Sequence, residues 1–203
     1  MLAESNSFLA ERPIKNLIWK FALPGIASQL VNAVYNIVDQ IFVGWGIGDL
    51  GIAAITIVFP LATITTALSV LFGSGAAAKF SLLMGEGKED EAKSVIGTAI
   101  SLMLLIGTTI ALASMLFLKP LLAFFGATDL IMPHAQPYAF IICLGIPFGI
   151  FSTGASFYIR ADGSPVYSSA VLLSGAIFNI IFDPIFLFVF DMGIEGIALA
   201  TIL

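Results

Sequence analysis

The sequence predicts an all-α membrane protein, a polytopic bundle of about six transmembrane helices. Hydrophobic residues make up 59% of the 203-residue chain and charged residues only 10%, whereas an ordinary soluble domain is about 25% charged. Several apolar runs reach the roughly 20 residues that a helix needs to cross a bilayer. A transmembrane β-barrel would instead show alternating segments of about 10 residues, and the sequence contains no such series.

The apolar runs divide the chain into a polar N-terminal segment, residues 1–15, and a transmembrane bundle, residues 16–203. The predicted spans cover about 16–43, 51–84, 93–118, 131–159, 166–190 and 194–203. The second span is predicted to break near Pro60, because proline removes a backbone hydrogen bond. The last stretch, GIEGIALATIL, reaches only about 16 Å as a helix, half of a bilayer. We therefore expect the natural protein to continue beyond Leu203.

The distribution of basic residues predicts the orientation of the bundle. Seven of the eight Lys and Arg residues fall on one side if each predicted span crosses once. These residues are Arg12, Lys15, Lys20, Lys79, Lys88, Lys93 and Arg160. Only Lys119 falls on the other side. Because Lys and Arg concentrate in cytoplasmic loops, the N-terminus is predicted to be cytoplasmic, in a multi-pass protein of the plasma (inner) membrane.

The composition argues against several function classes. A net charge of −5 and a pI of about 4.6 disfavour nucleic acid as a partner. The single cysteine, Cys143, and the single histidine, His134, have no second Cys or His nearby for a metal site. Both are interpreted as structural. The sequence offers no evident Ser/His/Asp or Cys/His arrangement, so no enzyme activity is expected.

The first span carries polar residues at helical spacing. Gln29, Asn32, Asn36 and Asp39 are three, four and three residues apart, which places them on one face, and Tyr35 lies one turn before Asp39. A carboxylate at the centre of a span costs roughly 2.5–3.5 kcal/mol. The stripe is predicted to face a cavity or partner helices, because lipid offers no hydrogen bonds. The three amides are candidate substrate-cavity residues, with interhelical hydrogen bonding as the alternative.

The fifth span carries a second acid. In NIIFDPIF, Asn179 and Asp183 are one turn apart, and Pro184 frees a backbone carbonyl near residue 180. Neither Asp183 nor Asp39 has a Lys or Arg near it within its own span. A cap on a kinked helix is the structural alternative for Asp183. Because intramembrane acids usually mark ion or substrate sites, the two acids are predicted to share a proton or Na⁺, with no other cofactor.

Four stretches together resemble the N-terminal half of the multidrug and toxic compound extrusion (MATE) family. They are LPGIASQLVNAVYNIVDQIFVGWGIGDLGIAAI, GSGAAAKFSLLMGEGKEDEAK, YIRADGSPVYSS and NIIFDPIF followed by GIEGIALAT. The resemblance implies a fold of twelve helices in two six-helix lobes, with this chain as the N-terminal lobe. It also implies a cation site in this lobe. The residues that match that site are Asp39, Tyr35, Asn179, Asp183 and Thr201.

The leading hypothesis is a cation-coupled (H⁺ or Na⁺) antiporter that exports amphipathic or cationic drugs. Its expected partners are the lipid bilayer, a small-molecule drug and the missing C-terminal lobe. One alternative is a lipid-linked oligosaccharide flippase of the same superfamily. Such proteins often line their cavity with cationic residues, and no Lys or Arg occupies the outer halves of the first and fifth spans. The other alternative is a non-transporting membrane module that only binds partner helices.

Overall fold

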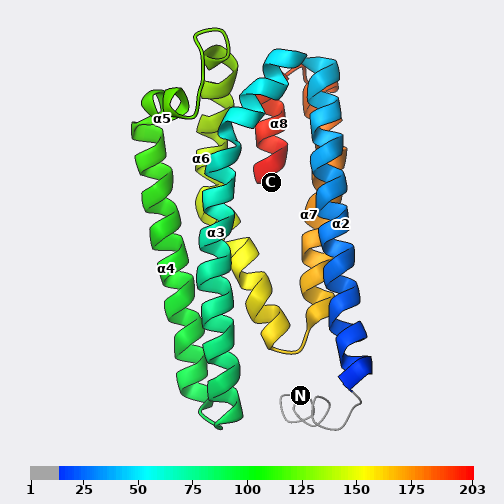
Figure 1. The fold of residues 1–203 in the computed structure, drawn as a ribbon, viewed down its shortest axis with the longest axis vertical. Coiled ribbons are helices and arrows are strands. Elements are labelled where there is room, and N and C mark those ends of the chain that lie inside the picture. Colours follow the sequence, from blue (N-terminus) through cyan, green and yellow to red (C-terminus); the bar gives the residue numbers. More distant parts are fainter. Residues whose placement is uncertain (1–13) are drawn as a thin grey trace.

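The protein is a bundle of long helices (Figure 1), and the computed structural model describes residues 14–203. The predicted N-terminal segment falls almost entirely outside the described residues, as do the side chains of 14–17, 20, 21, 24, 28 and 32. The elements are α2 (Ile14–Gly46), α3 (Asp49–Gly85), α4 (Glu89–Leu116), α5 (Leu118–Phe124), α6 (Met132–Ala161), α7 (Pro165–Pro184), η1 (Ile185–Val189) and α8 (Gly193–Ile202). The prediction of an all-α bundle is confirmed.

Four helical segments among the described residues are long and apolar enough to cross a membrane. They are α3, α4, α6 and the continuous run of α7 and η1, while α8 is a shorter apolar helix. Helix α2 contains 33 residues. The short helix α5 was not expected. It forms because Phe117 leaves the helical conformation, with φ −109° and ψ 28°, and Pro120 then fits the first turn of a new helix.

The predicted break at Pro60 is wrong, since α3 continues through this residue from Asp49 to Gly85. A proline removes one backbone hydrogen bond of a helix, and its ring crowds a carbonyl one turn earlier. Membrane bundles tolerate both effects because neighbouring helices and local adjustments compensate. Figure 1 shows the first turns of α3 leaning over at the end of the bundle that carries α5. This end, where α8 also begins, is called the α5 end below.

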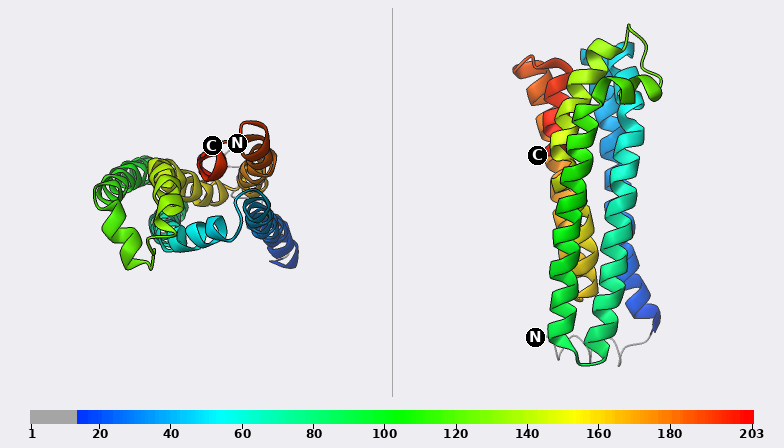
Figure 2. Two further views of the ribbon diagram at one scale, coloured as in Figure 1. Left: turned by 90° about the horizontal axis from the view of Figure 1, so that it is seen from above. Right: turned by 90° about the vertical axis from the view of Figure 1, so that its left-hand side faces the viewer.

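Helix α6 lies at the centre of the packing and contacts α3, α4, α5, α7 and α8 (Figure 2). Small residues allow the closest approaches, as is common between membrane helices. A Cβ added to Gly73 of α3 would lie 2.9 Å from the Cα of Gly154 in α6. A Cβ added to Gly107 of α4 would lie 2.8 Å from the Cα of Pro147 in α6. These contacts fix α3, α4 and α6 as one compact unit.

Replacing Gly73 with Ala is expected to lower the Tm of the detergent-solubilised protein. The new Cβ would meet backbone atoms of Gly154, which cannot rotate away, and overpacking of this kind costs about 1–3 kcal/mol. Gly75 provides the matched control on the same helix, because a Cβ there would meet no atom within 4 Å. Gly75→Ala should leave the Tm unchanged or raise it, since alanine favours the helix by up to about 1 kcal/mol. Equal effects of the two substitutions would show that α3 and α6 are not closely packed here.

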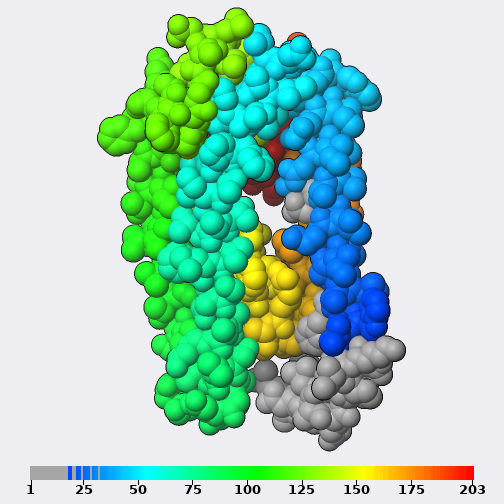
Figure 3. All heavy atoms as spheres, viewed as in Figure 1, coloured from blue at the N-terminus to red at the C-terminus, as the bar shows by residue number. Residues whose placement is uncertain are grey.

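Helix α2 stands apart from this unit. It packs mainly along α7 and makes few contacts with α3, although the two are consecutive in the chain. Figure 3 shows the molecule hollowed between α3 on one side and α2 on the other. The separation leaves a cavity between the compact unit of α3, α4 and α6 and the α2–α7 pair, and the candidate site lies at its edge.

Candidate cation site and central cavity

Two acidic side chains from different helices meet inside the bundle. Asp183 of α7 is fully buried, at 0% exposure, and Asp39 of α2 is 8% exposed. Their carboxyl groups lie within hydrogen-bonding reach of each other. Because an ionised carboxylate only accepts hydrogen bonds, a hydrogen bond between the two would need a proton on one of them. Neither acid forms an ion pair with a Lys or Arg among the described residues.

The local structure of α7 brings an amide to the pair. Asn179 lies one turn before Asp183 on the same face, and its Nδ2 donates a hydrogen bond of 3.3 Å to Asp183 Oδ1. After Pro184 the helix widens into the π-helix η1, a feature that is frequent at functional sites. Gly46 at the end of α2 allows η1 to come close, because a Cβ there would lie 2.6 Å from the side chain of Leu187. This contact holds α2 against α7 close to the two acids.

Tyr138 of α6 completes the cluster, and sequence reasoning missed it. The side chain is 6% exposed, and it lies near Thr201, Asp39 and Asp183. The Thr201 hydroxyl donates a hydrogen bond of 2.9 Å to the Ile197 carbonyl. The available signal was a tyrosine inside an apolar span, since a buried phenol normally needs a polar partner.

The four helices present these groups at one depth. Asp39, Tyr138, Asp183 and Thr201 each lie six to eight residues from the α5 end of their helix or helical run. At 1.5 Å per residue this is about 9–12 Å below that end. Residues that are far apart in the sequence therefore form one layer across α2, α6, α7 and α8.

Three oxygen atoms of this layer are buried without a hydrogen-bond donor among the described residues. They are Asp39 Oδ1, Asn179 Oδ1 and Asp183 Oδ2. Leaving a buried acceptor unsatisfied costs about 1–3 kcal/mol. A proton on a carboxylate, or a hard cation such as Na⁺ that takes oxygen ligands, would reduce this cost. The arrangement is therefore chemically suited to bind and release a small cation.

The layer borders a cavity of about 440 Å³. Tyr35, Asn179 and Thr201 belong both to the predicted cation site and to the cavity wall. Hydroxyl side chains of α3 and α6 line the remainder among apolar groups, and no Lys or Arg occurs among the lining residues. The hydroxyl residues are Thr65, Thr66, Ser69, Ser152 and Thr153.

Sequence reasoning missed the cavity hydroxyls because Ser and Thr are commonplace inside membrane helices. Their hydroxyl groups donate hydrogen bonds to backbone carbonyls one turn earlier in the same helix. Thr65 donates to the Leu61 carbonyl at 2.9 Å, and Ser69 donates to the Thr65 carbonyl at 2.8 Å. Such local bonds carry no information about which face of a helix lines a cavity. Only the packing of α3 against α6 shows that hydroxyl groups of both helices line the same cavity.

The polar stripe predicted on α2 divides in the structure. Gln29 and Asn36 are exposed, and neither lines the cavity. The side chain of Asn32 lies outside the described residues. Since each residue advances a helix by about 100°, Gln29 and Asn36 lie about 80° and 60° around α2 from Asp39. This offset is wide enough for Asp39 to face α7 while the two amides lie on the exposed surface.

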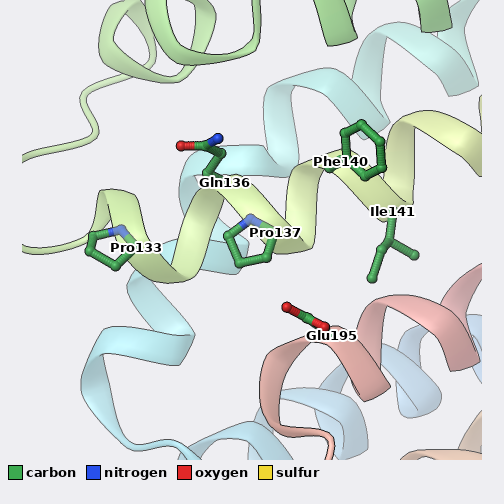
Figure 4. Close-up of a pocket in the computed structure, with 6 residues that line it drawn as sticks. All are labelled: Pro133, Gln136, Pro137, Phe140, Ile141 and Glu195. Carbon is green, nitrogen blue, oxygen red and sulfur yellow. The ribbon is translucent and has the colours of Figure 1, made fainter.

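A second hollow of about 320 Å³ lies at the α5 end, between α6 and α8. Its lining residues are Pro133, Gln136, Pro137, Phe140, Ile141 and Glu195. Figure 4 shows Glu195 projecting from α8 toward the α6 side of the hollow. Glu195 is exposed, and the hollow contains none of the predicted site residues. It lacks the buried, unsatisfied oxygens that distinguish the acidic layer.

The fold and the site define a polytopic helical membrane protein with a buried acidic pair beside a central cavity. The chain belongs to the MatE family, whose family model matches residues 24–185. The predicted membership in this family is thereby confirmed.

Similar proteins support this assignment. The chain is 29% identical over 201 residues to the multidrug export protein MepA of Staphylococcus aureus (strain NCTC 8325 / PS 47), in an alignment that covers 99% of this chain and 45% of MepA. Its identity to MepA of Staphylococcus haemolyticus (strain JCSC1435) is 28%, covering 99% and 44%. The chain thus spans a little under half the length of these relatives.

Solved structures agree with the sequence comparison. The structure of the MATE multidrug transporter DinF-BH matches with a TM-score of 0.87 at 32% identity, covering 95% of this chain and 44% of DinF-BH. An outward-facing multidrug resistance MATE family transporter of the MOP superfamily matches with a TM-score of 0.85 at 26% identity, covering 91% and 41%. The bundle therefore has the helical arrangement of part of a MATE transporter.

Proposed function

We propose that this chain is the N-terminal lobe of a cation-coupled antiporter that exports amphipathic or cationic compounds. The observation that carries the proposal is the buried pair of Asp39 and Asp183, whose layer holds three unsatisfied oxygens at the edge of a cavity. The names of the relatives support it, since MepA is a multidrug export protein and DinF-BH is a multidrug transporter.

The geometry suggests how cation and drug exchange. Tyr35, Asn179 and Thr201 border both the acidic layer and the cavity, so a drug in the cavity lies close to the two acids. With the pair negatively charged, a cationic drug is attracted. A cation that binds the pair removes this attraction, and the drug is released. Two interacting carboxyls titrate as a unit, which makes the release respond to the pair and not to either acid alone.

The same layer suits either coupling ion. A proton fits the contact between Asp39 and Asp183, because one shared proton joins two carboxyl groups. Na⁺ also fits, because the predicted site offers it only oxygen atoms as ligands. These oxygens belong to the two acids, Asn179, Tyr35 and Thr201. An anionic lipid-linked sugar fits less well, because phosphate recognition relies on Arg or Lys and the lining residues include neither.

We also propose that the α5 end faces outward across the plasma membrane and that a second lobe joins this one, forming what is called the two-lobe transporter below. Alternating access usually requires one bundle to rock against another around the site. Single cysteines at Asp49 and Glu86, two exposed acids at opposite ends of α3, test the orientation. An impermeant thiol reagent outside intact cells should label position 49 and not 86, while the native Cys143 is buried. Reversed labelling would invert the orientation.

The function is tested by dye export from proteoliposomes that contain the two-lobe transporter. Ethidium, a fluorescent cationic dye, should move against its own gradient when an opposing gradient of protons or of Na⁺ is imposed. One of the two gradients should suffice, and collapsing it with an ionophore should stop the movement. Dye movement that is independent of both gradients would contradict cation-coupled antiport.

A further inference from the structure

Three hydroxyl groups of α3 line the central cavity, and each donates its proton to the helix backbone. Thr66 Oγ1 lies 3.0 Å from the Ala62 carbonyl oxygen, and Thr65 and Ser69 form the same kind of bond with the turn before them. A carbonyl oxygen carries no proton, so the hydroxyl group is the donor in each bond. Each hydroxyl oxygen keeps lone pairs, and a ligand in the cavity therefore meets it as a hydrogen-bond acceptor.

Two of these three hydroxyl residues are open to the cavity. Thr66 is exposed and Thr65 is half-buried, whereas Ser69 is only 1% exposed. Thr65 and Thr66 are called the acceptor wall below. Within the described part of α3, the one further lining residue is Ala62, which has no polar side-chain group. The α3 side of the cavity therefore accepts hydrogen bonds while its hydroxyl protons are held by the backbone.

The acceptor wall lies well away from the acidic layer. The Ser69 carbonyl oxygen is 3.7 Å from a Cβ added to Gly154 of α6, so the two residues lie at the same depth. Gly154 follows Tyr138, which belongs to the acidic layer, by 16 residues on α6, or about 24 Å of helix. Thr65 is one turn closer to that layer, which leaves about 18 Å along the bundle. A ligand that reaches both regions must be elongated.

Building on the proposed function, we propose that the acceptor wall selects elongated amphipathic cations that carry an O–H or N–H donor at the end opposite the charge. Such a donor bonds to Thr65 or Thr66 while their own bonds to the backbone stay intact. An ether or ester oxygen in the same place meets only acceptors. It gains a hydrogen bond from the wall only if a hydroxyl group turns away from its carbonyl, which leaves that carbonyl without its bond. Ligands with acceptor-only ends should therefore bind less tightly.

The preference arises on α3 and not on α6. Ser152 and Thr153 of α6 also line the cavity, and a hydroxyl group is able to donate as well as accept. A phenol and an ether can therefore both accept a bond from α6, but only the phenol can also donate to the acceptor wall. The difference in affinity between two such ligands thus reports on Thr65 and Thr66.

The test compares two bisbenzimidazole dyes that share a piperazine cation at one end. At the other end one dye carries a phenol hydroxyl group and the second an ethoxy group. Binding of each dye to the purified two-lobe transporter is measured by fluorescence, with no ion gradient. The ratio of the two affinities, phenol dye over ethoxy dye, should be about 3- to 10-fold higher in the wild type than in the double variant Thr65→Val/Thr66→Val. This is the effect expected of one net hydrogen bond.

Thr63→Val is the matched control. Thr63 is an exposed residue of the same helix and donates the same kind of bond, at 3.0 Å to the Phe59 carbonyl, but it is not among the residues that line the cavity. Valine keeps the branched shape of threonine at all three positions and removes only the hydroxyl group. The control variant should therefore keep the wild-type ratio of affinities.

An unchanged ratio in the double variant would overturn the acceptor wall, and so would a wild type that binds neither dye. A general distortion of the cavity would weaken both dyes alike and would also leave the ratio unchanged. If the double variant does not fold, Thr66→Val is the second variant, and it should lower the ratio in the same direction. Failure of the proposed function is distinguishable, because it appears as ethidium export that is independent of both gradients, whereas the ratio is measured without any gradient.

Discussion

Replacing Asp39 with Asn is expected to abolish gradient-driven dye export by the two-lobe transporter while the protein stays folded. The substitution keeps the shape of the side chain but removes the charge that, in the proposed exchange, binds a cation at one step and attracts a cationic drug at the other. An interaction with a charged group contributes about 1.5–3 kcal/mol. Because both steps lose it, export should fall by at least about 100-fold. The measurement is the initial rate of ethidium export under the coupling gradient.

Gln40 provides the matched control for Asp39. It is the next residue on α2 but is exposed, whereas Asp39 is buried. Gln40→Ala should therefore export dye at a rate close to that of the wild type, and circular dichroism should show the same helix content for both variants. Wild-type export by Asp39→Asn would mean that this acid has only a structural role.

Replacing Asp183 with Asn should cause nearly the same loss, and the double variant with Asp39→Asn should lose no more than either single one. The reason is that the two carboxyl groups lie within hydrogen-bonding reach of each other and, in the proposed exchange, share one cation. Groups that function together show strongly non-additive effects when removed. The double-mutant cycle should accordingly give a large coupling energy in the rate of dye export.

The control for Asp183 is Asp191, an exposed acid a short distance beyond the same helical run. Asp191→Asn removes the same charge outside the buried layer and should preserve export. Independent losses that multiply in the double variant would show that Asp39 and Asp183 serve separate sites. Such a result would be compatible with export that depends on each acid separately, but it would contradict a cation shared by both.

The sequence was informative where local periodicity carries the signal. Asn179 and Asp183 are one turn apart on a single helix, so their direct hydrogen bond follows from helical geometry. The sequence also suggested that Asp39 and Asp183 lie close together, because an unpaired charge inside a membrane is energetically costly. The family resemblance led to the same residues, including Tyr35 and Thr201.

The remainder depends on tertiary packing that no local pattern encodes. Tyr138 joins the site because α6 passes between the other helices, not because of its own neighbours in the sequence. The same applies to two helix boundaries. The helix that ends before Phe117 was not predicted, and the helix that continues through Pro60 was predicted to break. A proline or a bulky residue permits a bend or a break, and the surrounding helices decide between them.

The most direct test of the shared site measures ethidium bound to the purified two-lobe transporter by fluorescence anisotropy, while Na⁺ concentration or pH is varied. If the acidic pair exchanges a cation for a drug, bound dye should be released as Na⁺ or protons saturate the pair. Asp39→Asn should not release its remaining dye in response to either ion. Wild-type dye binding that is unchanged across both titrations would contradict the exchange of cation and drug at Asp39 and Asp183.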